Sequence, residues 1–286
     1  MKPKAGLSRG AGCPGHVGWL VRTGQVLKTN DGQPVEVMEL RHTKDGAILS
    51  EWARHFRNQY CADSQIDALR QGTKYSRSEY LREIKFPDEH ARPGPSIRAG
   101  DFGEILVADY LEYCLGYTLP RWRYNDKSTR DESTRGTDVI GFKILDSGIN
   151  DPNDALALFE TKAQLTRSTP NRRLQDAVDG SAKDEVRKAE SLNAIKQRFL
   201  DRNQFAEMKM VERFQNPEDF PYSEVYGAVA LLSSAVYDVN AVCQTTTTSH
   251  PRAGDLTLLV IHGPDLMELV RELYRRAADE ADAEIQ

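Results

Sequence analysis

Residues 155–163 read ALALFETKA, an apolar run interrupted by a glutamate and a lysine two positions apart. Its length and composition are those of a buried strand, and strand alternation places Glu160 and Lys162 on the same face. Charged side chains in an otherwise apolar strand are costly unless they pair with each other or bind something. The run therefore predicts a strand that carries either an internal ion pair or one side of a polar site.

Two further carboxylates occur where apolar residues are expected. Asp138 enters the preceding strand-like run, TDVIGFKI (137–144). Glu104 begins the apolar stripe of a helix expected over residues 101–115, with Asp101 as its N-cap. Taken singly, the aspartate could be an ordinary strand-edge residue, and the glutamate could sit at a helix start because of the helix dipole.

Taken together, these residues have the chemistry of a metal-assisted hydrolytic site. The spacing between Asp138 and Glu160 suits two antiparallel strands joined by a loop. Two strand carboxylates and one helix carboxylate can hold a hard divalent cation such as Mg²⁺, or alternatively Mn²⁺, through oxygen ligands. A lysine beside them can position an attacking water and stabilise the charge on a phosphate. The set predicts phosphodiester hydrolysis by Glu104, Asp138, Glu160 and Lys162, with the three carboxylates as metal ligands.

The order of these residues resembles that of the PD-(D/E)xK nuclease superfamily, in which a helix glutamate precedes a strand aspartate and a Glu-x-Lys strand. Here Thr137 stands where that motif usually has proline. The resemblance implies a restriction-endonuclease-like core, a central mixed β-sheet flanked by helices. We accordingly expect an α/β (α+β) fold, which the alternation of strand-like and helix-like runs along the chain also indicates.

The segments around these residues resemble the HamA family of the Hachiman antiphage-defence system. The similar segments are AGDFGEILVADYLEYCLGY (99–117), RGTDVIGF (135–142), LALFETKA (156–163) and, upstream, SEWARHFRNQY (50–60). The resemblance implies a partner, the superfamily 2 helicase HamB, and a joint role in defence against phage. It also implies DNA as the substrate of a nuclease site at Glu104, Asp138, Glu160 and Lys162.

The remaining patterns divide the chain into an extension and a nuclease domain. Residues 1–95 are expected to form a family-specific extension, disordered over residues 1–16 and followed by a β-hairpin that turns at Asn30-Asp31-Gly32. A proline-rich connector over residues 86–99 leads into a nuclease domain of residues 96–286. Further expected elements are a helix over 47–60, strands over 225–236 and 256–262, and an acidic C-terminal helix over 265–278. One long helix is expected over 174–205, with a buried stripe of Val178, Ala182, Val186, Ala189 and either Ile195 or Phe199.

Composition limits what else the chain can be. Its 286 residues carry a net charge of −5, from 38 Lys and Arg against 43 Asp and Glu, which excludes a uniformly basic nucleic-acid binder but not a local basic patch. The four cysteines lack CxxC spacing, so neither a zinc ribbon nor a disulfide scaffold is expected, and a cytoplasmic location fits. The sequence contains no apolar stretch long enough to cross a membrane and no secretory signal. It also lacks a GxxxxGK[ST] loop, so an ATP-driven motor must be another protein.

Basic residues surround the expected catalytic strands. The expected DNA contacts are Arg135, Arg167, Arg172, Arg173 and Lys183. A second basic group lies among Trp122 and Tyr124, whose rings could stack on unpaired bases; it comprises Arg121, Arg123, Lys127, Arg130 and again Arg135. Basic loops are also common as plain solvated surface.

Two other functions stay open: a non-catalytic adaptor that binds DNA or the helicase, and a restriction or junction endonuclease on the same core.

Overall fold

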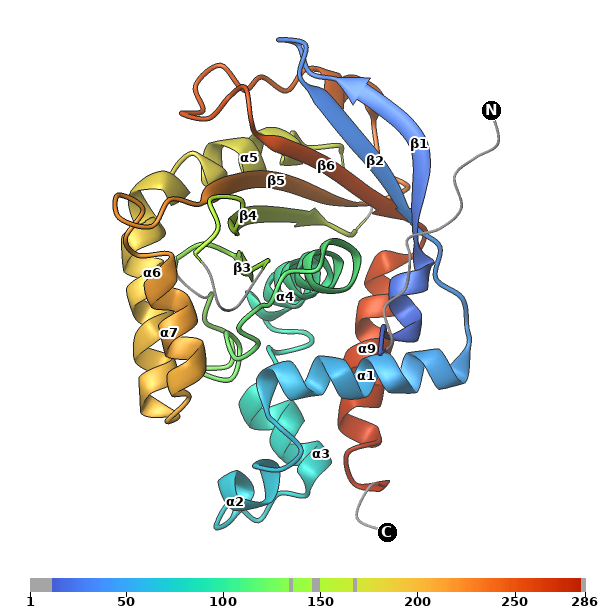
Figure 1. Cartoon of the computed structure of the whole chain (residues 1–286). Coiled ribbons are helices and arrows are strands. Elements are labelled where there is room, and N and C mark those ends of the chain that lie inside the picture. Colours follow the sequence, from blue (N-terminus) through green and yellow to red (C-terminus); the bar gives the residue numbers. More distant parts are fainter. Residues whose placement is uncertain (1–11, 134–135, 146–149, 167–168, 284–286) are drawn as a thin grey trace.

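The computed structural model describes residues 12–133, 136–145, 150–166 and 169–283. Its centre is a six-stranded mixed sheet in the order β1-β2-β6-β5-β4-β3 (Figure 1). The central strands β2, β6, β5 and β4 run parallel, and the edge strands β1 and β3 each pair antiparallel with their neighbour. The expected α/β fold with a central mixed sheet is confirmed. The strands are β1 (Leu20–Lys28), β2 (Pro34–Leu40), β3 (Val139–Lys143), β4 (Ala155–Gln164), β5 (Ser223–Ser233) and β6 (Thr257–Gly263).

Helices cover both faces of the sheet (Figure 1). One face packs against α1 (Gly46–Tyr60), α4 (Gly94–Asp109) and α9 (Leu266–Asp279), and the other packs against α5 (Arg173–Ser181), α6 (Asp184–Asp201) and α7 (Phe205–Arg213). In β4, Phe159 faces the first group and Leu158 the second. Glu160 and Lys162 follow Leu158 in the alternation, so they face the side of α5 and α6. The shorter helices are η1 (Gly15–Trp19), α2 (Ile66–Arg70), α3 (Arg77–Tyr80), η2 (Leu81–Lys85), η3 (Tyr110–Cys114) and α8 (Val239–Cys243).

The expected N-terminal hairpin is present, and it belongs to the main sheet. Its strands pair antiparallel on either side of a turn that contains Gly32, whose φ of +87° is one that glycine readily adopts. β2 then pairs in parallel with β6. Residues 1–11 of the expected tail lie outside the described residues, while Gly15–Trp19 form a 3-10 helix in which His16 is buried. The division of the chain at residue 95 stays a prediction.

The expected connector over residues 86–99 is wrong in its second half, because α4 begins at Gly94. Pro95 lies in the first turn of this helix, where the N–H that proline lacks has no intrahelical partner in any case. The N-cap role expected for Asp101 is also wrong. This aspartate lies inside α4, buried, and its Oδ2 accepts a hydrogen bond from the Tyr60 hydroxyl at 2.7 Å.

The single helix expected over residues 174–205 is wrong as well. The structure has α5 and α6 there, separated at Ala182 and Lys183, and α7 begins at Phe205. Because the helical periodicity does not continue through this break, the expected stripe is wrong directly after it: Val186 is 84% exposed, and Ala189 is exposed as well. Ile195 and Phe199, which the stripe offered as alternatives at its end, are both buried, together with Asp184 and Leu192.

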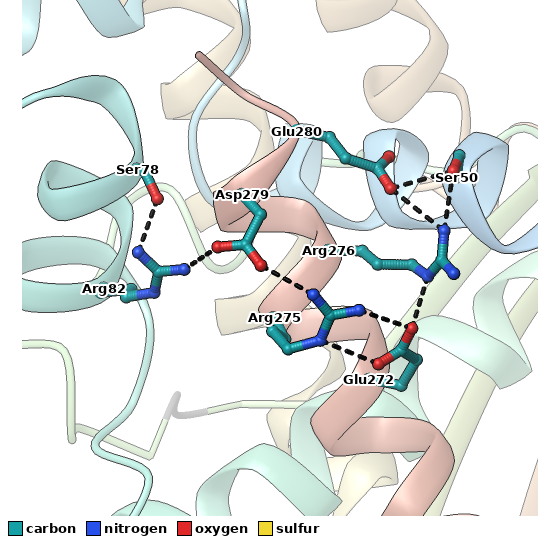
Figure 2. Close-up of polar contacts among 8 residues, drawn as sticks. All are labelled: Ser50, Ser78, Arg82, Glu272, Arg275, Arg276, Asp279 and Glu280. Atoms are coloured by element: carbon teal, nitrogen blue, oxygen red, sulfur yellow. Dashed lines mark hydrogen bonds and ion pairs between the residues drawn. The ribbon is translucent and has the colours of Figure 1, made fainter. Parts of the chain in front are cut away.

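Charges on the C-terminal helix α9, which has as many basic as acidic residues, pair within the molecule (Figure 2). Ser50 of α1 donates a hydrogen bond to Glu280 at 2.9 Å, and Arg82 of η2 pairs with Asp279. These contacts fix α9 to two segments of the first 95 residues. Along α9, Arg275 pairs with Glu272 and Asp279, and Arg276 pairs with Glu272 and with Glu280, the residue that follows the helix.

Candidate active site

The four residues expected to be catalytic line one cavity of about 850 Å³. Glu104 comes from α4, which packs on β3 and β4. Asp138 directly precedes β3, and Glu160 and Lys162 lie on β4. The antiparallel pairing of β3 with β4, which the spacing of the two strand carboxylates suggested, is what brings Asp138 beside Glu160.

Asp138 is fixed by the backbone of the neighbouring strand. Its Oδ2 accepts a hydrogen bond from the backbone N–H of Thr161 at 3.0 Å. Its Oδ1 lies 3.2 Å from Nη2 of Arg123. A carboxylate held in this way has a defined direction before any ligand arrives, which is a requirement of a preorganised site.

Glu160 and Lys162 form an ion pair on the cavity wall, with 2.5 Å between Oε1 and Nζ. Burial and the nearby charge of Asp138 raise the pKa of Glu160 to about 7. Burial works against the ammonium form of Lys162, but its hydrogen bond to Glu160 outweighs this, and the pKa of the lysine is raised. The ion pair and the site lining expected as alternatives thus occur together.

Glu104 is held from the side of α4, and its side chain is only 14% exposed. Its Oε2 accepts a hydrogen bond from the buried Tyr124 hydroxyl at 2.8 Å. Burial, together with the charge of Asp138, raises the pKa of Glu104 to about 8. Protonation of the two glutamates therefore competes with cation binding up to neutral pH.

Arg123 lies between two of these carboxylates. Its Nε is 3.1 Å from Oε2 of Glu104, its Nη2 is 3.2 Å from Oδ1 of Asp138, and its Nη1 donates to the Thr137 carbonyl at 2.6 Å. Burial opposes the charge of this guanidinium, but Glu104 and Asp138 outweigh it and raise the pKa of Arg123. An arginine expected to contact phosphate is therefore engaged with two carboxylates of the candidate site.

The carboxylates of the candidate site are the right kind of ligand for a hard divalent cation, but they are not arranged to bind one in this structure. Carboxylate oxygens are the ligands that Mg²⁺ prefers in proteins. Here, however, Arg123 contacts Glu104 and Asp138, and Lys162 contacts Glu160. Within the described part of the chain, no three His, Cys, Asp or Glu side chains are placed to hold a metal ion together.

A fourth carboxylate near the site escaped sequence reasoning. Asp184, in the first turn of α6, is fully buried, and its Oδ1 accepts a hydrogen bond from the Thr137 hydroxyl at 2.9 Å. Its Oδ2 has no hydrogen-bond partner among the described residues. Burial, with a contribution from Asp138, raises the pKa of Asp184 to about 6. The only sequence signal was indirect: a hydroxyl-bearing threonine at the place where the motif has proline.

Of the five expected DNA contacts, those that the structure describes do not line this cavity. Arg135 and Arg167 lie outside the described residues. Arg172 donates to the Gln244 carbonyl at 3.0 Å, and Arg173 pairs with Asp176 at 2.9 Å, both at the start of α5. Lys183 is exposed between α5 and α6 and does not line the cavity. Two arginines of α6 do line it: Arg187 and Arg198.

In the second basic group, which lies around Trp122 and Tyr124, the described side chains contact acidic residues of the same chain. Arg121 pairs with the buried Asp109 at 2.9 Å, and Lys127, whose side chain is 3% exposed, pairs with Asp101. Tyr124 is buried and so presents no face to an unpaired base. In these positions the basic side chains neutralise buried carboxylates. Trp122 packs edge-on against Phe199, and Arg130 pairs with Asp88.

A model of the HamA family matches residues 16–277, which include the N-terminal hairpin, all four expected catalytic residues and most of α9. The chain belongs to the HamA family. Membership of this family indicates a role in antiphage defence. Comparison with curated proteins gives no match to this HamA chain. Among its described helices, none has both the length and the apolar character that spanning a membrane requires.

Proposed function

We propose that this HamA protein is a metal-dependent deoxyribonuclease that hydrolyses phosphodiester bonds during antiphage defence. The observation that carries the proposal is the convergence of Glu104, Asp138, Glu160 and Lys162 on one cavity from a helix and two paired strands. Carboxylates beside a lysine in a cleft are the groups that such a reaction needs.

The residues have distinct roles in this proposal. Asp138, Glu160 and Glu104 would hold Mg²⁺ or Mn²⁺, which supplies Lewis-acid activation of water and neutralises phosphate charge. Lys162, whose side chain is 36% exposed, can turn from Glu160 toward a phosphate oxygen at the cavity mouth. Its ammonium stays charged at neutral pH because its pKa is raised. Arg187 on the cavity wall adds positive charge for a DNA backbone.

We further propose that a HamB-type superfamily 2 helicase is the partner and controls the nuclease. The proposal follows from family membership, and from the lack in this sequence of the phosphate-binding loop that an ATP-driven motor requires. A nuclease active without restraint would damage the DNA of its own host. Cleavage should therefore depend on the helicase meeting suitable DNA.

The test uses the chain together with its helicase partner on linear, nicked, circular and single-stranded DNA, with Mg²⁺ or EDTA. Each of three substitutions should lower the cleavage rate by a factor of about 100 or more while the complex still forms: Asp138→Ala, Glu160→Ala and Lys162→Ala. Asp176→Ala is the matched control, because this carboxylate pairs with Arg173 outside the cavity. Cleavage by the Lys162 variant at near wild-type rate would contradict the assignment. The chain alone cutting plasmid as fast as the complex would contradict the control by the helicase.

A second function deserves the same test because Arg123 and Lys162 both contact the site carboxylates. A protein with permanently neutralised carboxylates would be a non-catalytic adaptor that binds DNA or the helicase. In that case the wild-type complex binds every DNA substrate but cuts none, with either Mg²⁺ or Mn²⁺.

A further inference from the structure

Arg123 holds the space that the proposed nuclease leaves for a cation. We propose that its guanidinium is an internal counter-ion that replaces the divalent ion between Glu104 and Asp138, and that the site binds metal only after Arg123 withdraws. This inference rests on the proposed function and adds a regulatory step to it. The site would therefore be closed in the resting protein by a residue of the same chain.

The contacts of Arg123 are those of a competitor for metal. The guanidinium contacts Oε2 of Glu104 and Oδ1 of Asp138, at 3.1 and 3.2 Å. A divalent ion bound between the same two carboxylates would need the space that the guanidinium fills and would neutralise the same negative charges. A planar guanidinium matches carboxylates well, and charge-assisted hydrogen bonds are among the strongest that side chains make. Occupation by the arginine and by the ion is therefore mutually exclusive.

Burial explains why a resident cation is needed. The side chains of Glu104 and Asp138 are only 14% and 12% exposed, and that of Arg123 is 18% exposed. Two carboxylates withdrawn from water would repel each other and lose solvation unless a positive charge lies between them. In the resting chain, Arg123 supplies that charge. Removing the Arg123 side chain should therefore leave two carboxylates without a counter-ion, and a divalent ion from solution can then bind between them.

The setting of Arg123 differs from that of Lys162, which also pairs with a carboxylate of the proposed site. Lys162 contacts a single carboxylate oxygen, and its side chain is twice as exposed, at 36%. Arg123 contacts two carboxylates and the Thr137 carbonyl. It also lies on an irregular segment between η3 and β3, so its withdrawal breaks no helix or strand hydrogen bonds. A partner that binds this segment could therefore open the site.

The first test measures binding of Mn²⁺ and Mg²⁺ to the full chain without DNA, by isothermal titration calorimetry. The positive charge of Arg123, so close to Glu104 and Asp138, should lower their affinity for a cation by about tenfold or more. Arg123→Met should therefore bind Mn²⁺ at least about tenfold more tightly than wild type. Arg198→Met is the matched control: Arg198 lines the same cavity but pairs with Asp126 at 2.9 Å, and its loss should leave affinity unchanged. Equal affinity of wild type and Arg123→Met would overturn the inference.

The second test is thermal unfolding with EDTA or with the ion. Arg123→Met should unfold at a lower temperature than wild type in EDTA, and Mn²⁺ should restore most of the loss, because a ligand that binds only the folded state stabilises it. An equal loss with and without Mn²⁺ would overturn the inference. If Arg123→Met does not fold at all, Arg123→Lys decides, since it keeps one charge with fewer donors and should bind Mn²⁺ more tightly than wild type.

These outcomes separate the inference from the proposed function. If wild type and both Arg123 variants bind the ion equally while Asp138→Ala abolishes binding, the metal site stands and the proposed role of Arg123 is wrong. If no variant binds the ion and the complex never cleaves DNA, both the inference and the metal-dependent nuclease are wrong.

Discussion

At the scale of single residues, Asp184 is the clearest case of a side chain whose burial lowers the stability of the folded protein. It is fully buried, only one of its oxygens is hydrogen-bonded, and two other site carboxylates, Asp138 and Glu160, lie in the same electrostatic neighbourhood. An incompletely paired buried charge destabilises the folded state. We therefore expect the folded protein to be more stable without this charge.

The pKa of Asp184 fixes the pH range of this effect. The pKa is raised from 3.8 to about 6 on folding, so the unfolded chain loses the proton first as pH rises. Stability is unaffected below the unfolded pKa, falls between about pH 4 and pH 6, and keeps the full penalty above that. In EDTA, Asp184→Asn should therefore raise the free energy of unfolding by on the order of 2 kcal/mol near pH 8, and by little near pH 4.

Chemical denaturation at the two pH values checks this expectation. Asp176→Asn is the control, because Asp176 is 44% exposed on its side chain, outside the cavity. It should shift stability by less than about 0.5 kcal/mol at either pH. An Asp184→Asn variant that is less stable at pH 8 would mean that the carboxylate has a stabilising partner.

At the scale of elements, Gly180 sets how closely α5 packs on β4. A Cβ atom at this position would lie 2.5 Å from Oε1 of Glu160, closer than such atoms approach. Gly180→Ala must therefore move either Glu160 or the helix. This should cost about 1–3 kcal/mol of stability and, if the proposed nuclease site is correct, weaken cleavage by the complex. Thermal unfolding and the DNA-cleavage assay measure the two effects.

Gly100 offers a matched control within α4. A Cβ atom there would meet nothing within 4 Å, so Gly100→Ala should be neutral or stabilise the protein by up to about 1 kcal/mol through helix propensity. If Gly180→Ala behaves in the same way, with full cleavage, the close approach of α5 to Glu160 is not required for function.

Sequence reasoning succeeded for these elements where a local pattern decides the structure. The alternation in residues 155–163 gave the strand and the shared face of Glu160 and Lys162, and the Asn30-Asp31-Gly32 turn gave the hairpin. It failed where a long-range contact decides. The early start of α4 and the break before Asp184 depend on packing, and nothing local indicates that Arg123 turns inward to two carboxylates from other elements.

At the scale of the whole molecule, the N-terminal segment and the expected nuclease domain share one core. The buried side chains of Trp52, Phe56 and Tyr60 on α1 belong to the same apolar cluster as those of α4 and α9. The Tyr60 hydroxyl contacts Tyr274 of α9 at 2.5 Å, and Asp109 of α4 accepts from His16 and His55 at 2.9 Å each. β2 covers the edge of β6 as well.

These contacts predict that residues 96–286 do not fold alone, although sequence patterns place a domain boundary at residue 95. Removing residues 1–95 would expose the apolar face of α4 and α9 and leave β6 as an open sheet edge, a state prone to aggregation. Residues 96–286 expressed alone should be insoluble or lack a cooperative thermal transition, whereas co-expression with residues 1–95 should give a soluble complex with one transition. Circular dichroism and size-exclusion chromatography compare the two preparations. A fragment 96–286 that unfolds cooperatively by itself would establish the boundary and limit the first 95 residues to an added role.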